Sequence, residues 1–219
     1  MTHKMTDQEL YRALGALTKN RDAWRENISY VGSLLEGQSP RITAKALWLL
    51  GEMGLQNPDE AAPYVAKIAS FLESQDDLLR ERSLNALGRI GRARYETVKP
   101  HWDKMLALSK DGNPSVRLAF IWASENIATN MIFGHSEVLT VGQSENPFIR
   151  KSTLDLFAEF LHDSDDRVRM EAPEMFRVLG KRKPELVMPY LDQLRALSET
   201  DSNRVVRIHC LGAIKSIGQ

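Results

Sequence analysis

The chain has 219 residues, of which 42% are hydrophobic, and its 29 Lys and Arg residues balance 29 Asp and Glu. This length suits one or two domains, and the balanced charge argues against a chain-wide attraction to nucleic acid or an anionic membrane. No stretch approaches the ~20 apolar residues that span a bilayer, and a single cysteine, Cys210, excludes an internal disulfide framework. Because residues 1–17 lack a secretory signal pattern, we expect a soluble cytoplasmic protein.

The first predicted element is a helix from about Thr6 to Lys19. We expect residues 1–21 to cap the N-terminal side of a single domain that covers 1–219. In the rest of the chain, apolar residues fall at helical spacing between breaks rich in Gly, Pro and Asp. No segment shows the sustained period-2 alternation of a strand, so the predicted fold class is all-α.

A short pattern then recurs along residues 22–218. An aliphatic residue precedes an arginine, and ten residues after the arginine an apolar residue is followed by glycine; threonine or alanine replaces a member once each. The residues at the arginine position are Thr43, Arg80, Arg117, Arg169 and Arg207. A fixed period of this kind is the signature of a repeat architecture.

Each repeat is predicted to be a helical hairpin. The second helix carries the arginine, with core residues one position before it and six and ten positions after it. The first helix begins an apolar run near a proline, at Pro63, Pro100 or Pro189. Neither helix can bury its apolar stripe alone, so neighbouring hairpins must stack.

The repeat spacing predicts one irregularity. Successive arginine positions are 37, 37, 52 and 38 residues apart, so the long interval holds about 15 surplus residues. We assign the surplus to an irregular insert near residues 130–146, which has glycines at both ends. The insert makes the spacing between Arg117 and Arg169 irregular, while the repeats on both sides of it remain assigned.

The helix predicted in residues 147–161 fits the repeat pattern in two alternative registers. From Phe148 it reads like the second helix of a hairpin, whereas Leu154–Phe157 matches a first helix. We favour the first-helix register because a tight turn at 163–166 then leads into the next arginine helix. Pro173 falls inside that helix and should kink it or delay its regular hydrogen bonding.

Turn residues before the second helices point to helix capping. Aspartate is a preferred N-cap because its carboxylate accepts hydrogen bonds from the first free N–H groups of a helix. The expected N-caps are Asp76, Asp111, Asp165 and Asp201. Cys210 shares its repeat position with small residues and is expected to be a buried core residue rather than a reactive thiol.

The segment from Asp165 through Arg169 to Gly180 resembles the HEAT-repeat consensus, and residues 77–91 and 201–218 do so too. The resemblance covers about residues 22–218 and departs from the consensus at a few positions, such as Thr43. It implies an armadillo-like, right-handed α-solenoid of about five HEAT-type hairpins plus the N-terminal helix. It also implies a concave face, lined by the second helices, that most often holds a protein partner.

The resemblance implies a structural role for the repeated arginine. In similar proteins this arginine bonds a turn aspartate of a neighbouring repeat, which gives a ladder of charge-assisted hydrogen bonds across the repeat junctions. The candidate partners are Asp76, Asp77, Asp111, Asp165, Asp166 and Asp201. We favour this ladder over a phosphate-binding ridge.

The fifth position after the arginine should face the concave side. Tryptophans occupy it in two repeats, where a solvated residue is expected, and large aromatic side chains on a groove wall are typical anchors for a partner. The competing interpretation is that both tryptophans pack as spacers between second helices. The predicted concave binding residues are Lys45, Trp48, Arg82, Asn85, Arg89 and Trp122.

These features predict a non-catalytic scaffold or adaptor that binds a protein or peptide, with no cofactor, no metal and no membrane contact. The five histidines show no metal-ligand spacing, and neither a Gly-rich phosphate loop nor a nucleophile elbow occurs. A bilin lyase-like or chaperone role is an alternative that no residue specifically supports.

The main alternative is a nucleic-acid-binding protein, because cations are frequent from Arg80 to Lys104. Bacterial alkylpurine DNA glycosylases with HEAT-like solenoids use tryptophans, basic residues and an acidic residue near the lesion. Those residue types are available as Trp48, Trp122, Arg82 and Asp155. No local motif of that family is present, however, and Asp155 lies on a predicted first helix.

Overall fold

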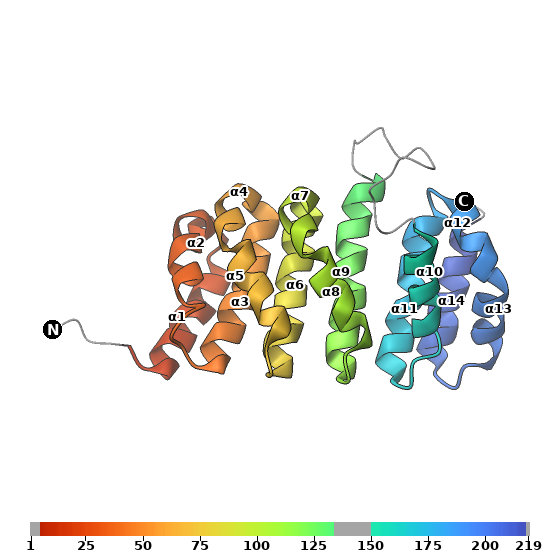
Figure 1. Cartoon of the computed structure of the whole chain (residues 1–219), viewed down its shortest axis with the longest axis horizontal. Helices are drawn as coiled ribbons and strands as arrows, with labels where there is room; N and C mark the ends of the chain where they lie inside the picture. Colours follow the sequence, from red (N-terminus) through yellow and green to blue (C-terminus); the bar gives the residue numbers. More distant parts are fainter. Residues whose placement is uncertain (1–4, 134–149, 218–219) are drawn as a thin grey trace. The chain divides into compact units, whose positions relative to one another are not determined.

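A computed structural model describes residues 5–133 and 150–217, with side chains described for 5–129 and 150–217. All regular secondary structure in these residues is helical, as predicted (Figure 1). The chain groups into two compact units, Met1–Lys110 and Asp111–Gln219, called unit 1 and unit 2 below. The single-domain organisation expected from the sequence stays a prediction. None of the described helices is long and apolar enough to cross a membrane.

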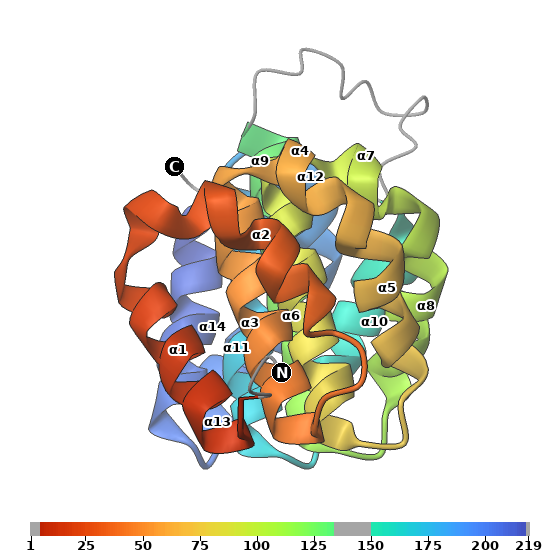
Figure 2. The same cartoon turned by 90° about the vertical axis from the view of Figure 1, so that its left-hand side faces the viewer.

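Unit 1 begins with the predicted leading helix. Its helices are α1 (Asp7–Lys19), α2 (Trp24–Ser33), α3 (Pro40–Gln56), α4 (Pro58–Ala61), α5 (Val65–Ser70), α6 (Asp77–Ala93), α7 (Tyr95–Val98) and α8 (Trp102–Ala107). Thr6 caps α1 through a capping box, in which the Thr6 hydroxyl accepts from the Glu9 N–H and the Glu9 carboxylate accepts from the Thr6 N–H. In the view of Figure 2, α3 and α6 lie between α1 and α5.

Unit 2 continues the same pattern. Its helices are α9 (Pro114–Phe133), α10 (Lys151–Phe160), α11 (Asp166–Gly180), α12 (Pro184–Val187), α13 (Leu191–Thr200) and α14 (Arg204–Ser216). Residues 130–133 belong to α9, so the predicted insert cannot begin before residue 134. The rest of the predicted insert, up to residue 146, lies outside the described residues.

The favoured register of the helix after the insert agrees with the contacts within unit 2. α10 packs against α11, and a short turn joins the two helices. Phe157 and Phe160 of α10 also form an aromatic cluster with Phe120 of α9, with ring centroids 5.8 to 6.2 Å apart. α11 passes through Pro173 without ending there, and the proline ring is buried in the core. The first residues of the predicted 147–161 segment, up to 149, lie outside the described residues.

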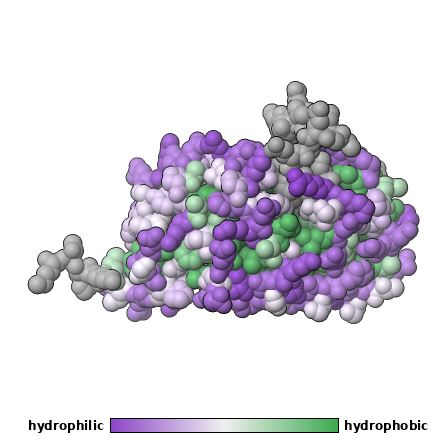
Figure 3. All heavy atoms as spheres, in the orientation of Figure 1, coloured by the Kyte–Doolittle hydropathy of each residue, from purple (hydrophilic) through white to green (hydrophobic). Residues whose placement is uncertain are grey.

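The core follows the predicted repeat positions. The aliphatic residue before the arginine and the apolar residue six positions after it are buried in every repeat. Within unit 1 this stripe joins α3 to α6, and within unit 2 it joins α11 to α9 and to α14. Cys210 is fully buried in α14, and this burial raises the pKa of its thiol to about 12. On the face drawn in Figure 3, hydrophilic residues predominate towards both ends of the helices, with hydrophobic residues mainly between them.

Glycines allow the second helices of unit 1 to approach closely. A Cβ atom added to Gly51 of α3 would lie 2.8 Å from the Cα atom of Ala86 in α6. One added to the repeat glycine Gly54 would lie 2.5 Å from Cγ1 of Ile90. The glycine of the repeat pattern is therefore a packing requirement at this helix pair.

The first helices are less regular than the pattern predicted. Three of them are split by a 3-10 turn that contains the proline: Ala62–Tyr64, Lys99–His101 and Met188–Tyr190. A proline has no N–H to donate and its ring clashes with the preceding turn, so regular α-helix resumes only at the next residue. The apolar run therefore starts after the proline, as predicted, but a short helix of four residues precedes it.

The turns before four of the second helices, α6, α9, α11 and α14, share one hydrogen-bonding pattern. A side-chain oxygen accepts the N–H two residues later, and the side chain of that second residue accepts the N–H two residues further on. The successive acceptors are Ser74 and Asp76, Asp111 and Asn113, Asp163 and Asp165, and Asp201 and Asn203.

This pattern confirms two predicted N-caps and corrects two. Asp76 caps α6 and Asp165 caps α11. The predictions of Asp111 and Asp201 as N-caps are wrong, because each lies two residues too early. Their carboxylates accept from the N–H groups of Asn113 and Asn203. Asn203 caps α14, and the side chain of Asn113 accepts the Ser115 N–H at the start of α9.

Candidate functional site

A depression of about 390 Å³ lies in unit 1 where α1, α3 and α6 meet. It combines two aromatic rings, three cations and an aliphatic side chain. Its lining includes Tyr11, Arg41, Lys45, Trp48, Leu78 and Arg82. This set of residues is called the aromatic–basic pocket below. Arg41, Lys45 and Trp48 face it from one side of α3, at the spacing that places residues three or four apart on the same helix face.

Two of the cations are stacked on the two rings. The guanidinium carbon of Arg41 lies 4.2 Å from the ring centre of Tyr11, and the Lys45 Nζ atom lies 4.2 Å from the ring centre of Trp48. Such contacts are electrostatically favourable and fix the side chains against each other. Among the described residues, neither Arg41 nor Lys45 forms an ion pair with a carboxylate. Both therefore keep their charge available to a ligand.

The third cation and the apolar residues complete the pocket. Arg82 of α6 has one carboxylate nearby, that of Glu81, at 3.5 Å, and it stays partly exposed. Leu78 and Tyr11 are 39% and 37% exposed, so both offer apolar surface to a ligand. The pocket therefore suits a group that carries negative charge beside an apolar surface.

The structure brings three of the six predicted residues together, namely Lys45, Trp48 and Arg82. Arg89 lies further along α6 and pairs with Glu52 at 2.7 Å, while Asn85 is half-buried outside the pocket lining. Trp122 is half-buried on α9 in unit 2. These geometries leave the binding role of all six residues as a prediction.

Four lining residues are absent from the predicted set, and two of them, Tyr11 and Leu78, lay outside the reach of sequence reasoning. Tyr11 belongs to the leading helix, which lies outside the repeat register, so no column of the repeat alignment contains it. Leu78 is the second residue of α6, two positions before Arg80, and is not one of the repeat positions that the sequence pattern defines. The capping box at Thr6 fixes where α1 begins, and from it the helical spacing of Tyr11 relative to buried Leu10 and Leu14 could have been derived.

The cations from Arg80 to Lys104 do not form one positive surface. Most of the arginine and lysine side chains in this segment form ion pairs with acidic residues of unit 1. The pairs are Arg80 with Asp77, Arg89 with Glu52, Arg94 with Asp59, Lys99 with Glu96 and Lys104 with Glu73. This pairing removes the main observation that favoured nucleic-acid binding.

The acidic residue of the glycosylase alternative is also engaged elsewhere. Asp155 lies on α10, a first helix, where its carboxylate accepts from Lys151 at 2.7 Å and from the Tyr190 hydroxyl at 2.7 Å. Hydrogen bonds from Lys151 and from Tyr190 lower the pKa of Asp155. Its geometry is that of a structural residue in the outer part of unit 2. Among the described residues, no group of three or more His, Cys, Asp or Glu side chains is placed to hold a metal ion.

The ladder predicted for the repeated arginines is seen at Arg117 and Arg169, which bond turn aspartates of a neighbouring repeat. In each of four repeats, Nη1 of the arginine donates to the backbone carbonyl six residues earlier, at the start of its own turn. Arg117 also binds Asp163, and Arg169 binds Asp201, through Nε and Nη2. Asp201 was among the candidate partners, but Asp163 was not. Asp165 instead binds Arg167 and caps its helix.

Comparison with known proteins supports the fold. No family model and no curated protein matches this chain. Among solved structures, it is similar to a designed armadillo repeat protein in complex with the peptide (KR)4, with 16% identity and a TM-score of 0.67 over 98% of this chain and 95% of that one.

Two further solved structures are similar. An engineered protein shares 19% identity with a TM-score of 0.69, over 99% of this chain and 94% of its own. A computationally designed armadillo repeat protein for modular peptide recognition shares 15% identity with a TM-score of 0.64, over 96% of this chain and 94% of its own. At these identities the similarity concerns the fold alone.

Proposed function

We propose that this armadillo- and HEAT-like α-solenoid is a non-catalytic module that binds a peptide segment of a partner protein in the aromatic–basic pocket of unit 1. The observation that carries the proposal is the position of Trp48, half-buried in a depression beside Lys45 and Arg82. Aromatic and arginine side chains in a pocket are the residue types that dominate binding energy at protein interfaces. A cytoplasmic location, expected from the sequence, belongs to this proposal and is checked by cell fractionation.

The positive charge of the pocket favours a peptide with negative charge. Arg41 and Lys45 form no ion pairs among the described residues, so an acidic side chain of the ligand would gain charge-assisted hydrogen bonds there. An apolar residue next to that acid would contact exposed Leu78. Two of the similar designed proteins are described by their peptide recognition, one of them with a basic peptide. The pocket in this chain favours a peptide of the opposite charge.

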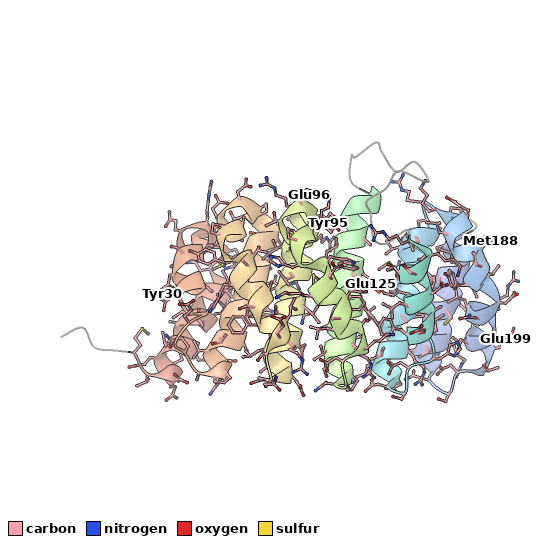
Figure 4. The ribbon with its side chains drawn as sticks, in the orientation of Figure 1. Tyr30, Tyr95, Glu96, Glu125, Met188 and Glu199 are labelled. Carbon is pink, nitrogen blue, oxygen red and sulfur yellow. The ribbon has the colours of Figure 1, made fainter. Side chains whose placement is uncertain are left out.

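A fluorescence anisotropy titration with a labelled peptide of alternating Glu and Leu tests the proposal. We expect Trp48→Ala to weaken binding at least tenfold, about 1.4 kcal/mol, and Lys45→Ala to weaken it with a reduced salt dependence. The matched control is Tyr30→Ala, which removes an aromatic ring that is 39% exposed on α2 (Figure 4). Equal binding by the wild type and Trp48→Ala would contradict the proposal. Trp122→Ala in the same titration tests whether the second predicted tryptophan contributes.

Nucleic-acid binding is a second candidate, because stacked rings beside cations also suit unpaired bases. A labelled DNA oligonucleotide, single-stranded or duplex, should then bind with a steep dependence on salt, since each phosphate contact releases counterions. We expect no such binding, because most cations between Arg80 and Lys104 are paired. Tight, salt-sensitive DNA binding that Trp48→Ala abolishes would replace the peptide proposal with this one.

A further inference from the structure

Unit 2 buries a carboxyl group that shares a side-chain hydrogen bond with Glu171 but has one oxygen without a partner. Glu125, near the middle of α9 (Figure 4), is only 8% exposed, and its Oε1 atom is buried without a hydrogen-bond partner. Burying an ionised carboxylate is unfavourable unless a charge or hydrogen bonds compensate for the lost water. A buried polar atom without a partner therefore requires an explanation, such as a ligand that supplies one.

The groups around Glu125 increase the negative charge. Glu171 and Glu174 of α11 are half-buried and lie close enough to act on Glu125 electrostatically. Burial raises the pKa of Glu125 well above its ordinary value, the charges of Glu171 and Glu174 raise it further, and Arg177 opposes them. Arg177 is already engaged, because its Nε atom donates to Glu174 at 2.6 Å.

A second buried atom without a partner lies next to the same carboxylates. Nδ1 of His209, on α14, is buried without a hydrogen-bond partner, 3.6 Å from Oε1 of Glu174. Polar side chains of α9, α11 and α14 are thus grouped around Glu174. Glu174 binds Arg177, whereas neither Glu125 nor Glu171 forms an ion pair with a described residue, so this cluster retains an excess of acidic groups.

These residues occupy the face of the second helices that carries the pocket in unit 1. Glu171 and His209 follow the repeat arginine by two positions, Glu174 by five and Glu125 by eight. In unit 1, Lys45 and Arg82 follow the arginine position by two, and Trp48 by five. Steps of three residues keep side chains on one helix face. Glu171 and Glu174 therefore occupy repeat positions equivalent to those of pocket residues, and Glu125 lies one step of three residues further along the same face.

We propose that Glu125, Glu171 and Glu174 form a binding site for a basic side chain, lysine or arginine, of a peptide bound on this face of unit 2. The cation contacts the half-buried Glu171 and Glu174, and its N–H groups reach Oε1 of Glu125 behind them. These carboxylates are not grouped closely enough to hold a metal ion, but a guanidinium or ammonium group spans a larger distance between acceptors. The site goes beyond the aromatic–basic pocket and does not depend on it.

Binding of labelled hexa-arginine and hexa-lysine peptides to the full chain tests this site by fluorescence anisotropy. We expect Glu125→Gln to weaken the binding of at least one of the two peptides fivefold or more. The matched control is Glu199→Gln, which removes one exposed carboxylate from α13, away from the site (Figure 4), and leaves the affinity unchanged. Wild-type affinity of Glu125→Gln for both peptides would overturn the proposal.

A calorimetric measurement separates a binding role from a structural one. Because burial and the neighbouring carboxylates raise the pKa of Glu125, they favour its protonated form, and a cation that binds beside it should shift the balance towards the ionised form and release protons. The heat of peptide binding should therefore depend on the ionisation enthalpy of the buffer in the wild type and not in Glu125→Gln. Identical wild-type heats in phosphate and Tris buffers would contradict the site.

Two further variants serve as controls for folding and for the separation of the two binding sites. Glu171→Gln changes a more exposed member of the site, so it remains informative if Glu125→Gln lowers the folded yield, and it too should weaken binding. Trp48→Ala should leave hexa-arginine binding unchanged while it abolishes binding of the acidic peptide. Loss of one binding activity without the other thus shows which of the two proposals fails.

Discussion

Arg117 binds Asp163 through two parallel hydrogen bonds, from Nε to Oδ2 at 2.8 Å and from Nη2 to Oδ1 at 2.7 Å. Its third nitrogen, Nη1, donates to the backbone carbonyl of Asp111 at 2.8 Å. One guanidinium thus fixes the turn before α9 and holds the turn before α11 to it. Because the side chains of Arg117 and Asp163 are only 15% and 10% exposed, this pair is screened much less than a surface pair.

The first prediction concerns the strength of this contact. Asp163→Asn keeps the oxygen that accepts the Asp165 N–H but removes the charge that faces Arg117. We expect the free energy of unfolding to fall by about 2–3 kcal/mol. Asp192→Asn, in an exposed pair with Arg195, should change it by less than about 0.5 kcal/mol. Urea unfolding of both variants gives the comparison, and equal midpoints would contradict the structural role.

The second prediction is a dependence of stability on acid. Although burial alone would raise the pKa values of Asp163 and Asp201, hydrogen bonds from Arg117 and Arg169 lower both. The lowered pKa values add stability that is present above the unfolded value of about 3.9 and is lost as the pH falls through the folded values. Urea midpoints should therefore drop more steeply between pH 5 and 2 in the wild type than in the double variant Asp163→Asn, Asp201→Asn. Parallel curves would refute this assignment.

The third prediction tests the glycines between α3 and α6. Gly51→Ala places a methyl group 2.8 Å from backbone of Ala86, so α6 must shift, and we expect a loss of about 1–3 kcal/mol. Gly15→Ala is the control, because a Cβ atom there meets nothing within 4 Å in the middle of α1. It should stabilise the protein by about 0.5–1 kcal/mol through helix propensity. Thermal unfolding of both variants measures the difference in sign.

The fourth prediction concerns the buried Glu125. Burial and the neighbouring carboxylates raise the pKa of Glu125, so its contribution is fully present below the unfolded value of about 4.3 and is lost as the pH rises towards the folded value. Glu125→Gln removes this loss. We expect the variant to gain stability relative to the wild type as the pH rises from 5 to 8. A constant difference in unfolding free energy over this range would show that folding does not raise the pKa of Glu125.

The sequence predicts the fold well because the repeat supplies the same information several times. The positions one before and six after the arginine are buried in every repeat. Because five copies share these positions, an unusual residue in one copy does not obscure the core. The N-caps were less predictable. Asp201 and Asn203 are both good capping residues, and only the nested turn geometry decides that Asn203 caps the helix while Asp201 receives Arg169.

The candidate site was only partly predictable, because it depends on contacts between helices. The repeat register identified Lys45, Trp48 and Arg82, which share one face. It could not identify Tyr11, because the position of α1 against α3 follows from packing and not from the repeat. Glu125 was missed for a different reason: a lone glutamate in a helix is usually solvated, and only its burial between α9 and α11 makes it informative.

The hydrogen bonds of the arginines join repeats that are neighbours in the sequence. The Arg117–Asp163 and Arg169–Asp201 pairs join residues 46 and 32 positions apart, about one repeat in each case. Contacts of this kind keep the contact order of the chain low, which favours fast folding by addition of one hairpin to the next. They also make unfolding local within each unit, so amide protons should exchange in blocks that correspond to individual hairpins.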